Sequence, residues 1–224
     1  VDGTSEPIDE FGRVGADYHS GSIYKLAITD SSPFQNTSCV IGNAARYATL
    51  GSPVILTGRF TIEFDWLRQN TATGTASQTT LSKASATARN TLQLYDTLHA
   101  TLPNAIGITG STTTRTLPNV LAGVAVGQVC RIKVERRDAN TLNAYVDGVL
   151  IDRQLSVIGT VEFDTAMVSS NLTGGKLPTG ASIQNLSVVN IETGDEYFWP
   201  MDEGSGATLN NTDSGTGSAH NMTL

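Results

Sequence analysis

The sequence predicts an all-β protein in which two antiparallel sheets form a sandwich, on three observations. Apolar and polar residues alternate along 131–153, in runs separated by short polar turns, as in hairpins with one buried face. Glycine is abundant, with 22 residues, and charged residues make up only 16% of the chain, which is typical of many short strands and turns. No long window has helical periodicity. A single sandwich can reach 224 residues.

Residues 1–21 are expected to form an extended N-terminal arm or linker without secondary structure of its own. They contain Pro7 and several glycines, and they show little alternation. Such a segment either packs on a neighbour or connects to an upstream domain. We therefore place the sandwich at residues 22–224.

The first half of the sandwich is predicted to contain strands at 22–30, 46–50, 58–67 and 79–82. In 58–67, large apolar residues alternate with Glu63 and Asp65. A register slip of one residue would expose all of these apolar side chains, so we expect them in the core and the two carboxylates outside. The apolar residues are Phe60, Ile62, Phe64 and Trp66. Residues 69–90 are expected to be a surface excursion around the strand at 79–82.

The segment 131–153 predicts a β-meander. The run 131–137 should pair with 141–147 across the turn at 138–140. A second tight turn is expected at Asp147-Gly148, where glycine tolerates positive φ, and a further strand starts at Val149. Later strands are expected at 180–188 and near 197–199. Stretches rich in Thr, Gly and Ser at 107–116 and 204–218 should be loops at the sandwich ends, where binding usually resides.

Four phrases, in this order along the chain, resemble those of the concanavalin A-like, laminin-G-like (LamG) β-sandwiches. They lie at 46–67, 142–150, 180–188 and 197–206, and the last contains the run W-P-M-D-E-G-S-G. The resemblance spans roughly residues 22–210. It implies a jelly-roll β-sandwich that serves as a glycan- or protein-recognition module of an extracellular or surface assembly.

The charge balance narrows the partners. A formal net charge of −7 and the lack of Lys/Arg runs interleaved with aromatics argue against nucleic acid. The chain has no run of about 18 apolar residues, so no segment is expected to span a membrane. One dense basic group occurs, and we interpret it as a solvated strand face balanced by Glu135 and Asp138. Its members are Arg131, Lys133, Arg136 and Arg137.

The two cysteines, Cys39 and Cys130, both lie in strand-like stretches. We interpret them as small buried apolar residues, with a disulfide between them as the alternative. They lack metal-site spacing and nearby paired histidines, which argues against structural zinc.

Glu63 and Asp65 are the candidate catalytic residues of this sequence. Their strand resembles the E-x-D-x-x-E strand of laminarinase-type glucanases, in which alternate carboxylates act as nucleophile and acid/base. Here Leu67 or Arg68 stands where the third carboxylate would be. The three histidines have no catalytic spacing, and no nucleophile elbow, zinc or phosphate-loop motif occurs. We therefore expect no enzyme, and keep a glycan-cleaving enzyme that uses Glu63 and Asp65 as an alternative.

Two kinds of binding residue can be named from the sequence. Sugar rings stack on exposed aromatic faces, and the candidates are Tyr95, Tyr145 and Trp199, although burial is favoured for Trp199. Ca²⁺ takes oxygen ligands, and several sandwiches of the resembled family bind it near a rim. Asp202, Glu203 and Asp213 offer such oxygens, but the same residue types also make turns. We expect no other cofactor.

These observations favour a non-catalytic binding or adhesion module. The family resemblance suggests a cell-surface glycan as ligand, and the polar loops and acidic charge suit a phage tail-fibre or capsid-decorating component. We thus expect an extracellular or virion location. The alternative is a purely structural protein that binds only neighbouring subunits of an assembly, for instance as a homo-oligomer, and holds no ligand.

Overall fold

The computed structural model describes residues 48–68, 77–83, 90–95, 97, 100–155, 157–168, 182–201 and 221–223, with short strands at 13–14, 17–18, 39–40 and 208–209. Regular structure in this part of the chain is β throughout. Among the same residues, no helix is long and apolar enough to cross a membrane. The chain divides into two compact units, Val1–Ser32 and Pro33–Leu224.

The first unit contains a short antiparallel strand pair. Strand β1 (Arg13–Val14) pairs with β2 (Asp17–Tyr18). The expectation that 1–21 lacks secondary structure is therefore wrong at these positions, because residues 13–14 and 17–18 pair with each other. The role of this segment as an arm or linker stays a prediction. The strand expected at 22–30 lies outside the described residues.

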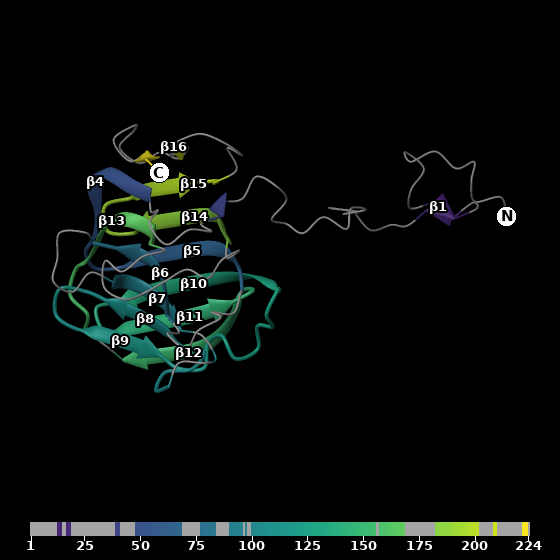
Figure 1. Ribbon diagram of the computed structural model, residues 1–224, viewed down its shortest axis with the longest axis horizontal. Helices are drawn as coiled ribbons and strands as arrows, with labels where there is room; N and C mark the ends of the chain where they lie inside the picture. Colours follow the sequence, from purple (N-terminus) through teal and green to yellow (C-terminus); the bar gives the residue numbers. More distant parts are fainter. Residues whose placement is uncertain are drawn as a thin grey trace. The chain divides into compact units, whose positions relative to one another are not determined.

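Within the described residues, the second unit contains a seven-stranded and an eight-stranded sheet, and every strand pair in them is antiparallel. The seven-stranded sheet has the order β12 (Val149–Leu155), β11 (Thr141–Val146), β10 (Val129–Asp138), β5 (Phe60–Leu67), β14 (Ser182–Asn190), β15 (Asp195–Trp199), with β3 (Cys39–Val40) also on β14. The eight-stranded sheet has the order β16 (Thr208–Leu209), β17 (Met222–Thr223), β4 (Ala48–Leu56), β13 (Val161–Val168), β6 (Ser77–Ser82), β7 (Asn90–Tyr95), β8 (Ile106–Thr109), β9 (Thr114–Leu117). In Figure 1 the two series of strands run down the molecule together, to β12 and β9 at one end. The predicted all-β, antiparallel sandwich is confirmed.

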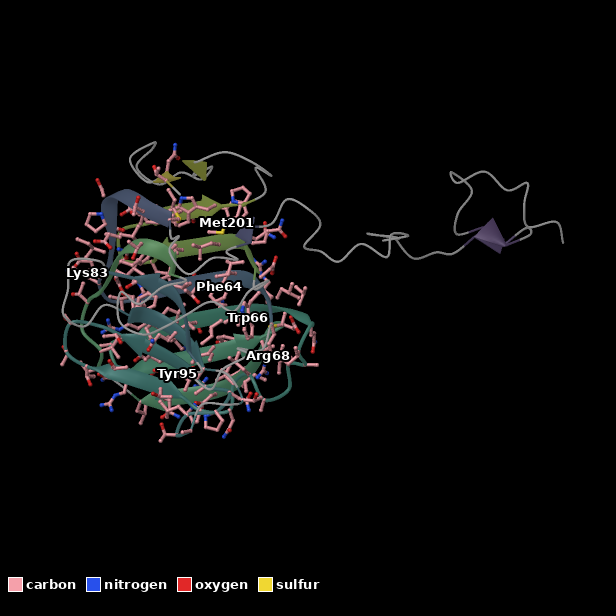
Figure 2. The ribbon with its side chains drawn as sticks, viewed as in Figure 1. Phe64, Trp66, Arg68, Lys83, Tyr95 and Met201 are labelled. Atoms are coloured by element: carbon pink, nitrogen blue, oxygen red, sulfur yellow. The ribbon has the colours of Figure 1, made fainter. Side chains whose placement is uncertain are left out.

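The core lies between the sheets, and β5 is its central strand in the seven-stranded sheet. Side chains of β5 alternate strictly between the interior and the outer surface. Phe60, Ile62 and Phe64 are fully buried and Trp66 is 1% exposed, and Figure 2 labels Phe64 and Trp66 among the side chains of the sandwich. Inward residues of both sheets belong to one hydrophobic cluster. The predicted orientation of this strand is confirmed.

The predicted meander is also confirmed. In the β10–β11 hairpin Ile132 lies opposite Val146. Asp147 and Gly148 adopt φ of 50° and 79°, the left-handed geometry of a two-residue hairpin turn. Arg136 departs from the solvated face that we predicted. It is only 6% exposed, because it lies on the inward side of β10, and its guanidinium donates to the Gly159 carbonyl at 2.6 Å.

The strand register separates the two cysteines. Cys39 pairs with Ile183, Ile183 with Trp66, and Trp66 with Cys130. Their backbones are thus three strand spacings apart, or about 14 Å, whereas a disulfide needs Cα atoms within about 7 Å. Cys130 is a buried free thiol, as predicted, and burial, with the charge of Asp147, raises its pKa to about 12.

Candidate functional site

One outer face brings together residues that the sequence marked for two different roles. We define the polar sheet face as Glu63 and Asp65 of β5, Arg131, Lys133 and Glu135 of β10, and Tyr145 of β11. Because β5, β10 and β11 are neighbours, their outward side chains lie in rows: Arg131 lies opposite Asp65, and Lys133 lies opposite both Glu63 and Tyr145. The suspected catalytic carboxylates and one suspected sugar-binding tyrosine therefore share this surface.

Arg131 joins the two carboxylates. Its Nε donates to Glu63 Oε1 at 2.5 Å, and its Nη1 donates to Asp65 Oδ1 at 3.0 Å. Burial alone would lower the pKa of Arg131, but the hydrogen bond to Glu63 and the two negative charges outweigh it and raise the pKa. Asn185, on β14, donates its Nδ2 to Asp65 Oδ2 at 2.7 Å. Both carboxylates are thus held in fixed orientations by donors.

A second network surrounds Tyr145. Its hydroxyl donates to Glu135 Oε2 at 2.7 Å, and Asn143 Nδ2 donates to the same oxygen at 2.9 Å. These bonds outweigh the effect of burial and lower the pKa of Glu135. The hydrogen bond to Glu135, followed by burial, raises the pKa of Tyr145. Lys133 Nζ lies 5.3 Å from the tyrosine ring centroid, a cation–π contact that occupies ring surface a sugar would need.

The polar sheet face is a set of hydrogen-bonding groups held in place by one another. A general base that works near neutral pH needs a pKa close to that pH. The pKa of the Tyr145 phenol is instead raised, further above neutral pH. On β5 the acid/base position of the glucanase pattern would fall at Leu67 or Arg68. Arg68 is 2% exposed, and its Nη1 donates to the Leu121 carbonyl at 2.6 Å, so it stabilises an interior turn instead.

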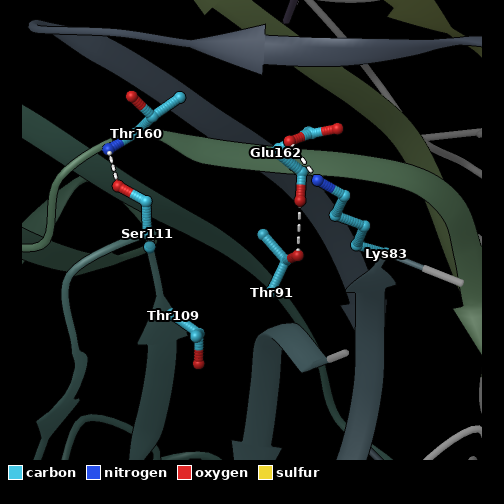
Figure 3. A pocket seen from close by; sticks show the side chains of 7 residues that line it. Lys83, Thr91, Thr109, Ser111, Thr160 and Glu162 are labelled. Carbon is cyan, nitrogen blue, oxygen red and sulfur yellow. Dashed lines mark hydrogen bonds and ion pairs between the residues drawn. The ribbon is translucent and has the colours of Figure 1, made fainter. Parts of the chain in front are cut away.

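A pocket of about 230 Å³ lies on the outer face of the other sheet. We call it the hydroxyl pocket, and Figure 3 shows its side chains, with Lys83 directed toward Glu162. Thr109, Gly110 and Ser111 form one side. The loop that we predicted at 107–116 is shorter than expected, because β8 ends at Thr109 and β9 begins at Thr114, and its residues 110 and 111 contribute to this concave surface. The lining residues are Lys83, Thr91, Thr109, Gly110, Ser111, Thr160 and Glu162.

Two of the predicted stacking residues offer no free ring face. Trp199 is fully buried and stacks on Tyr197 with centroids 5.9 Å apart. Tyr95 is 9% exposed, and its ring covers Gly107, where an added Cβ would lie 2.8 Å from the ring. The stacking role is therefore wrong for both, because these rings fill space that glycine and the core leave for them, and the burial that we favoured for Trp199 is confirmed.

The calcium candidates lie outside the described residues: Asp202, Glu203 and Asp213. Calcium binding there stays a prediction. In the part of the chain that the structure does describe, no group of three or more His, Cys, Asp or Glu side chains is placed to hold a metal ion.

Sequence reasoning missed the residues that organise both sites. Arg131 was assigned to a solvated basic face, although its position opposite Asp65 makes it the partner of both carboxylates. No sequence pattern pointed to Asn185. Its contact with Asp65 depends on a φ of 53° at an irregular position of β14, which period-two alternation does not predict. The pairing of Lys83 with Glu162 joins segments far apart in the chain.

Comparisons with protein-family models and with curated proteins found no match. Among solved structures, the chain is similar to the carbohydrate-binding module CBM66 from Bacillus subtilis, with 12% identity and a TM-score of 0.39 over 60% of this chain and 76% of that one. It is also similar to the polysaccharide lyase family 7 alginate lyase AlgAT5, with 13% identity and a TM-score of 0.37 over 62% of each chain. A botulinum neurotoxin serotype G binding domain matches with 12% identity and a TM-score of 0.35, over 65% of this chain and 35% of that one. The fold assignment rests on the strand order and burial described above.

Proposed function

We propose that the chain is a non-catalytic module that binds glycan through the polar sheet face. The observation that supports this most strongly is the fixed row of donors and acceptors across β5, β10 and β11, organised by Arg131 and by the Glu135–Tyr145 pair. The laminin-G-like phrases of the sequence point to the same class of module. A location on a cell surface, outside the cell or on a virion is part of this proposal.

Glycan binding fits the chemistry of this face. Sugar hydroxyls both donate and accept, and carboxylate, guanidinium, ammonium and phenol groups together offer both roles. Their mutual hydrogen bonds hold them in place before a ligand arrives, so less side-chain entropy is lost on binding. Opposite charges are interspersed rather than segregated, which favours a neutral or weakly charged ligand over a polyanion.

The affinity of a single site should be modest. The face carries one aromatic ring, Tyr145, and Lys133 covers part of it, so little stacking energy is available. Display of several copies on one assembly would raise the apparent affinity through effective concentration. We therefore expect binding that depends strongly on valency.

A glycan array tests this proposal, with the purified chain applied as monomer and as a multimer on beads. Arg131→Met should weaken binding at least about tenfold, because it releases both carboxylates, each normally held by a charge-assisted hydrogen bond. Arg59→Met is the matched control, since Arg59 forms an exposed ion pair with Glu192 outside this face.

Two results would count against the proposal. One is the absence of any glycan signal in the multimeric format. The other is release of reducing ends from a polysaccharide panel by the unmodified chain and its loss in Glu63→Gln, which would establish the glycan-cleaving alternative.

One observation favours the second candidate function, a structural assembly protein. Strand β12 is an edge strand with several large exposed apolar side chains: Val149, Leu150, Ile151 and Leu155 are 61, 42, 45 and 80% exposed. Edge strands of this kind pair with other chains, and a second copy of this chain is the partner we would expect. Light scattering of the unmodified chain and of Leu155→Asp separates the cases, since only a β12-mediated oligomer would dissociate in the variant.

A further inference from the structure

We propose that the hydroxyl pocket is a second ligand site, which takes one neutral, hydroxyl-rich unit the size of a single sugar ring. It lies on the outer face of the eight-stranded sheet, whereas the polar sheet face belongs to the seven-stranded sheet. The inference therefore stands on separate residues and can succeed or fail independently of the function proposed above.

The pocket is formed where neighbouring strands end. Glu162 is on β13, Thr91 on β7 and Thr109 on β8, and Lys83 directly follows β6. These strands are adjacent in the order β13-β6-β7-β8. Glu162 follows the inward-facing Val161, which is fully buried, so the period of two directs the carboxylate outward. Strand pairing thus brings together side chains from distant parts of the sequence.

Two interlocked loops form a preorganised wall. The Ser111 amide donates to the Thr160 carbonyl at 2.7 Å, and the Thr160 amide donates back to Ser111 Oγ at 3.0 Å, a bond visible in Figure 3. Gly110 permits this approach, because an added Cβ would lie 2.0 Å from the Ile158 carbonyl oxygen. From the interior, the guanidinium of Arg136 holds the carbonyl of Gly159 at 2.6 Å. A ligand would therefore meet a surface that needs little reordering.

The chemistry of the lining matches a polyol. Serine and threonine hydroxyls each provide one donor and two acceptor lone pairs, which is also what a sugar hydroxyl provides. Thr91 donates its hydroxyl hydrogen to the Glu162 carbonyl at 2.7 Å, so its oxygen is oriented with lone pairs for a donor from the ligand. Every side chain of the lining carries a polar group, so hydroxyls on several sides of a ligand could find hydrogen-bond partners.

The Lys83–Glu162 ion pair favours a neutral ligand. Lys83 Nζ bonds to Glu162 Oε2, and the two side chains are 30% and 27% exposed, so they reach the pocket while neutralising each other. An ammonium carries three donors and a carboxylate accepts at both oxygens, which leaves capacity for charge-assisted bonds to neutral hydroxyls. An anionic or cationic ligand would have to compete with the existing pair.

The size of the pocket limits the ligand to one ring. Its volume is about 230 Å³, below the roughly 300–1,000 Å³ typical of sites for drug-sized molecules. At about 30 Å³ per molecule of liquid water, the ligand would replace roughly seven or eight waters. A unit of that size should bind with Kd on the order of 1 mM.

Amide-detected NMR of the full chain tests the proposal, with methyl glycosides of glucose, galactose and mannose as neutral probes and methyl glucuronide as the anionic one. We expect saturable shifts of the Gly110, Ser111 and Thr160 amides with at least one neutral glycoside. Thr160→Val should weaken that binding about tenfold, because it exchanges one lining hydroxyl for a methyl group and keeps the backbone bonds to Ser111. Thr160→Ser, which keeps the hydroxyl, should restore it.

Arg59→Met is the control and should leave the pocket titration unchanged, because Arg59 pairs with Glu192 and belongs neither to the lining of the pocket nor to the polar sheet face. The proposal is overturned if no neutral glycoside produces saturable shifts up to about fifty times the expected Kd, or if methyl glucuronide binds in preference. It is also overturned if the saturable shifts are confined to the surroundings of Lys133 and Tyr145 and the amides of Gly110, Ser111 and Thr160 do not respond, a result that would support the polar sheet face alone.

Discussion

Replacement of Phe64 by alanine should be strongly destabilising, because it opens a cavity in the middle of the sandwich. Phe64 is fully buried and lies on β5, between β10 and β14, opposite Ile132. Phe→Ala changes at such sites cost about 3–5 kcal/mol, from lost transfer energy and from the cavity that stays behind. For a domain of this size each kcal/mol lowers Tm by about 2–4 °C. We thus expect Tm to fall by about 6–20 °C.

Guanidinium unfolding followed by tryptophan fluorescence measures this effect, since Trp66 and Trp199 are both buried and report on the core. Phe64→Leu should cost less than about 1.5 kcal/mol, because it conserves most of the volume. Thr61→Ala is the control on the outer face of β5 and should cost no more than about 1 kcal/mol. A cost below about 1 kcal/mol for Phe64→Ala would refute the placement of this strand at the centre of the core.

Three further outcomes follow from individual contacts. In a Cys39→Ser background, Cys130 should react with a disulfide reagent at about pH 8 roughly a thousandfold more slowly in the folded than in the unfolded chain, because burial raises its pKa; equal rates would contradict this. Tyr145→Phe should raise the pKa of Glu135 toward its ordinary 4.5, as followed by carboxyl NMR. A carboxylate whose pKa is lowered in the fold contributes stability above its unfolded pKa and loses it as pH falls through the folded pKa, so the stability deficit of the variant should be present at neutral pH and vanish in acid. Arg68→Met should cost more than about 2 kcal/mol by removing the buried hydrogen bonds to the Leu121 and Val124 carbonyls and should speed hydrogen exchange at Leu121, whereas unchanged exchange there would argue against that role.

The local sequence pattern was sufficient to predict the hairpins and the central strand β5. Alternation along β5 and β10 specifies which side chains are buried, because a slip of one residue exchanges the two faces of a strand. The Asp147-Gly148 pair specifies a tight turn through its backbone conformation. These features depend on neighbours in the sequence, and for that reason they could be predicted from the sequence.

The burial of individual polar and aromatic side chains could not be predicted in this way. Arg136 is in phase with the inward residues of β10, but a charged side chain is ordinarily expected in solvent; its burial is possible because the loop carbonyl of Gly159 accepts a hydrogen bond from its guanidinium. Tyr95 is covered because Gly107, on the adjacent strand, leaves room for its ring. In each case the partner is distant in the chain, so its identity follows only from strand pairing.

The sequence by itself determined the all-β class, the strand pairs with short turns and the outward placement of Glu63 and Asp65. The tertiary structure decided what those carboxylates do, since Arg131 and Asn185 reach them from β10 and β14. It also decided that the hydroxyl pocket exists, because its lining comes from β7, β8, β13 and the segments beside them. The physical reason is that period and turn chemistry act over a few residues, whereas a site is assembled by contacts between strands whose order in the sheet the local pattern does not specify.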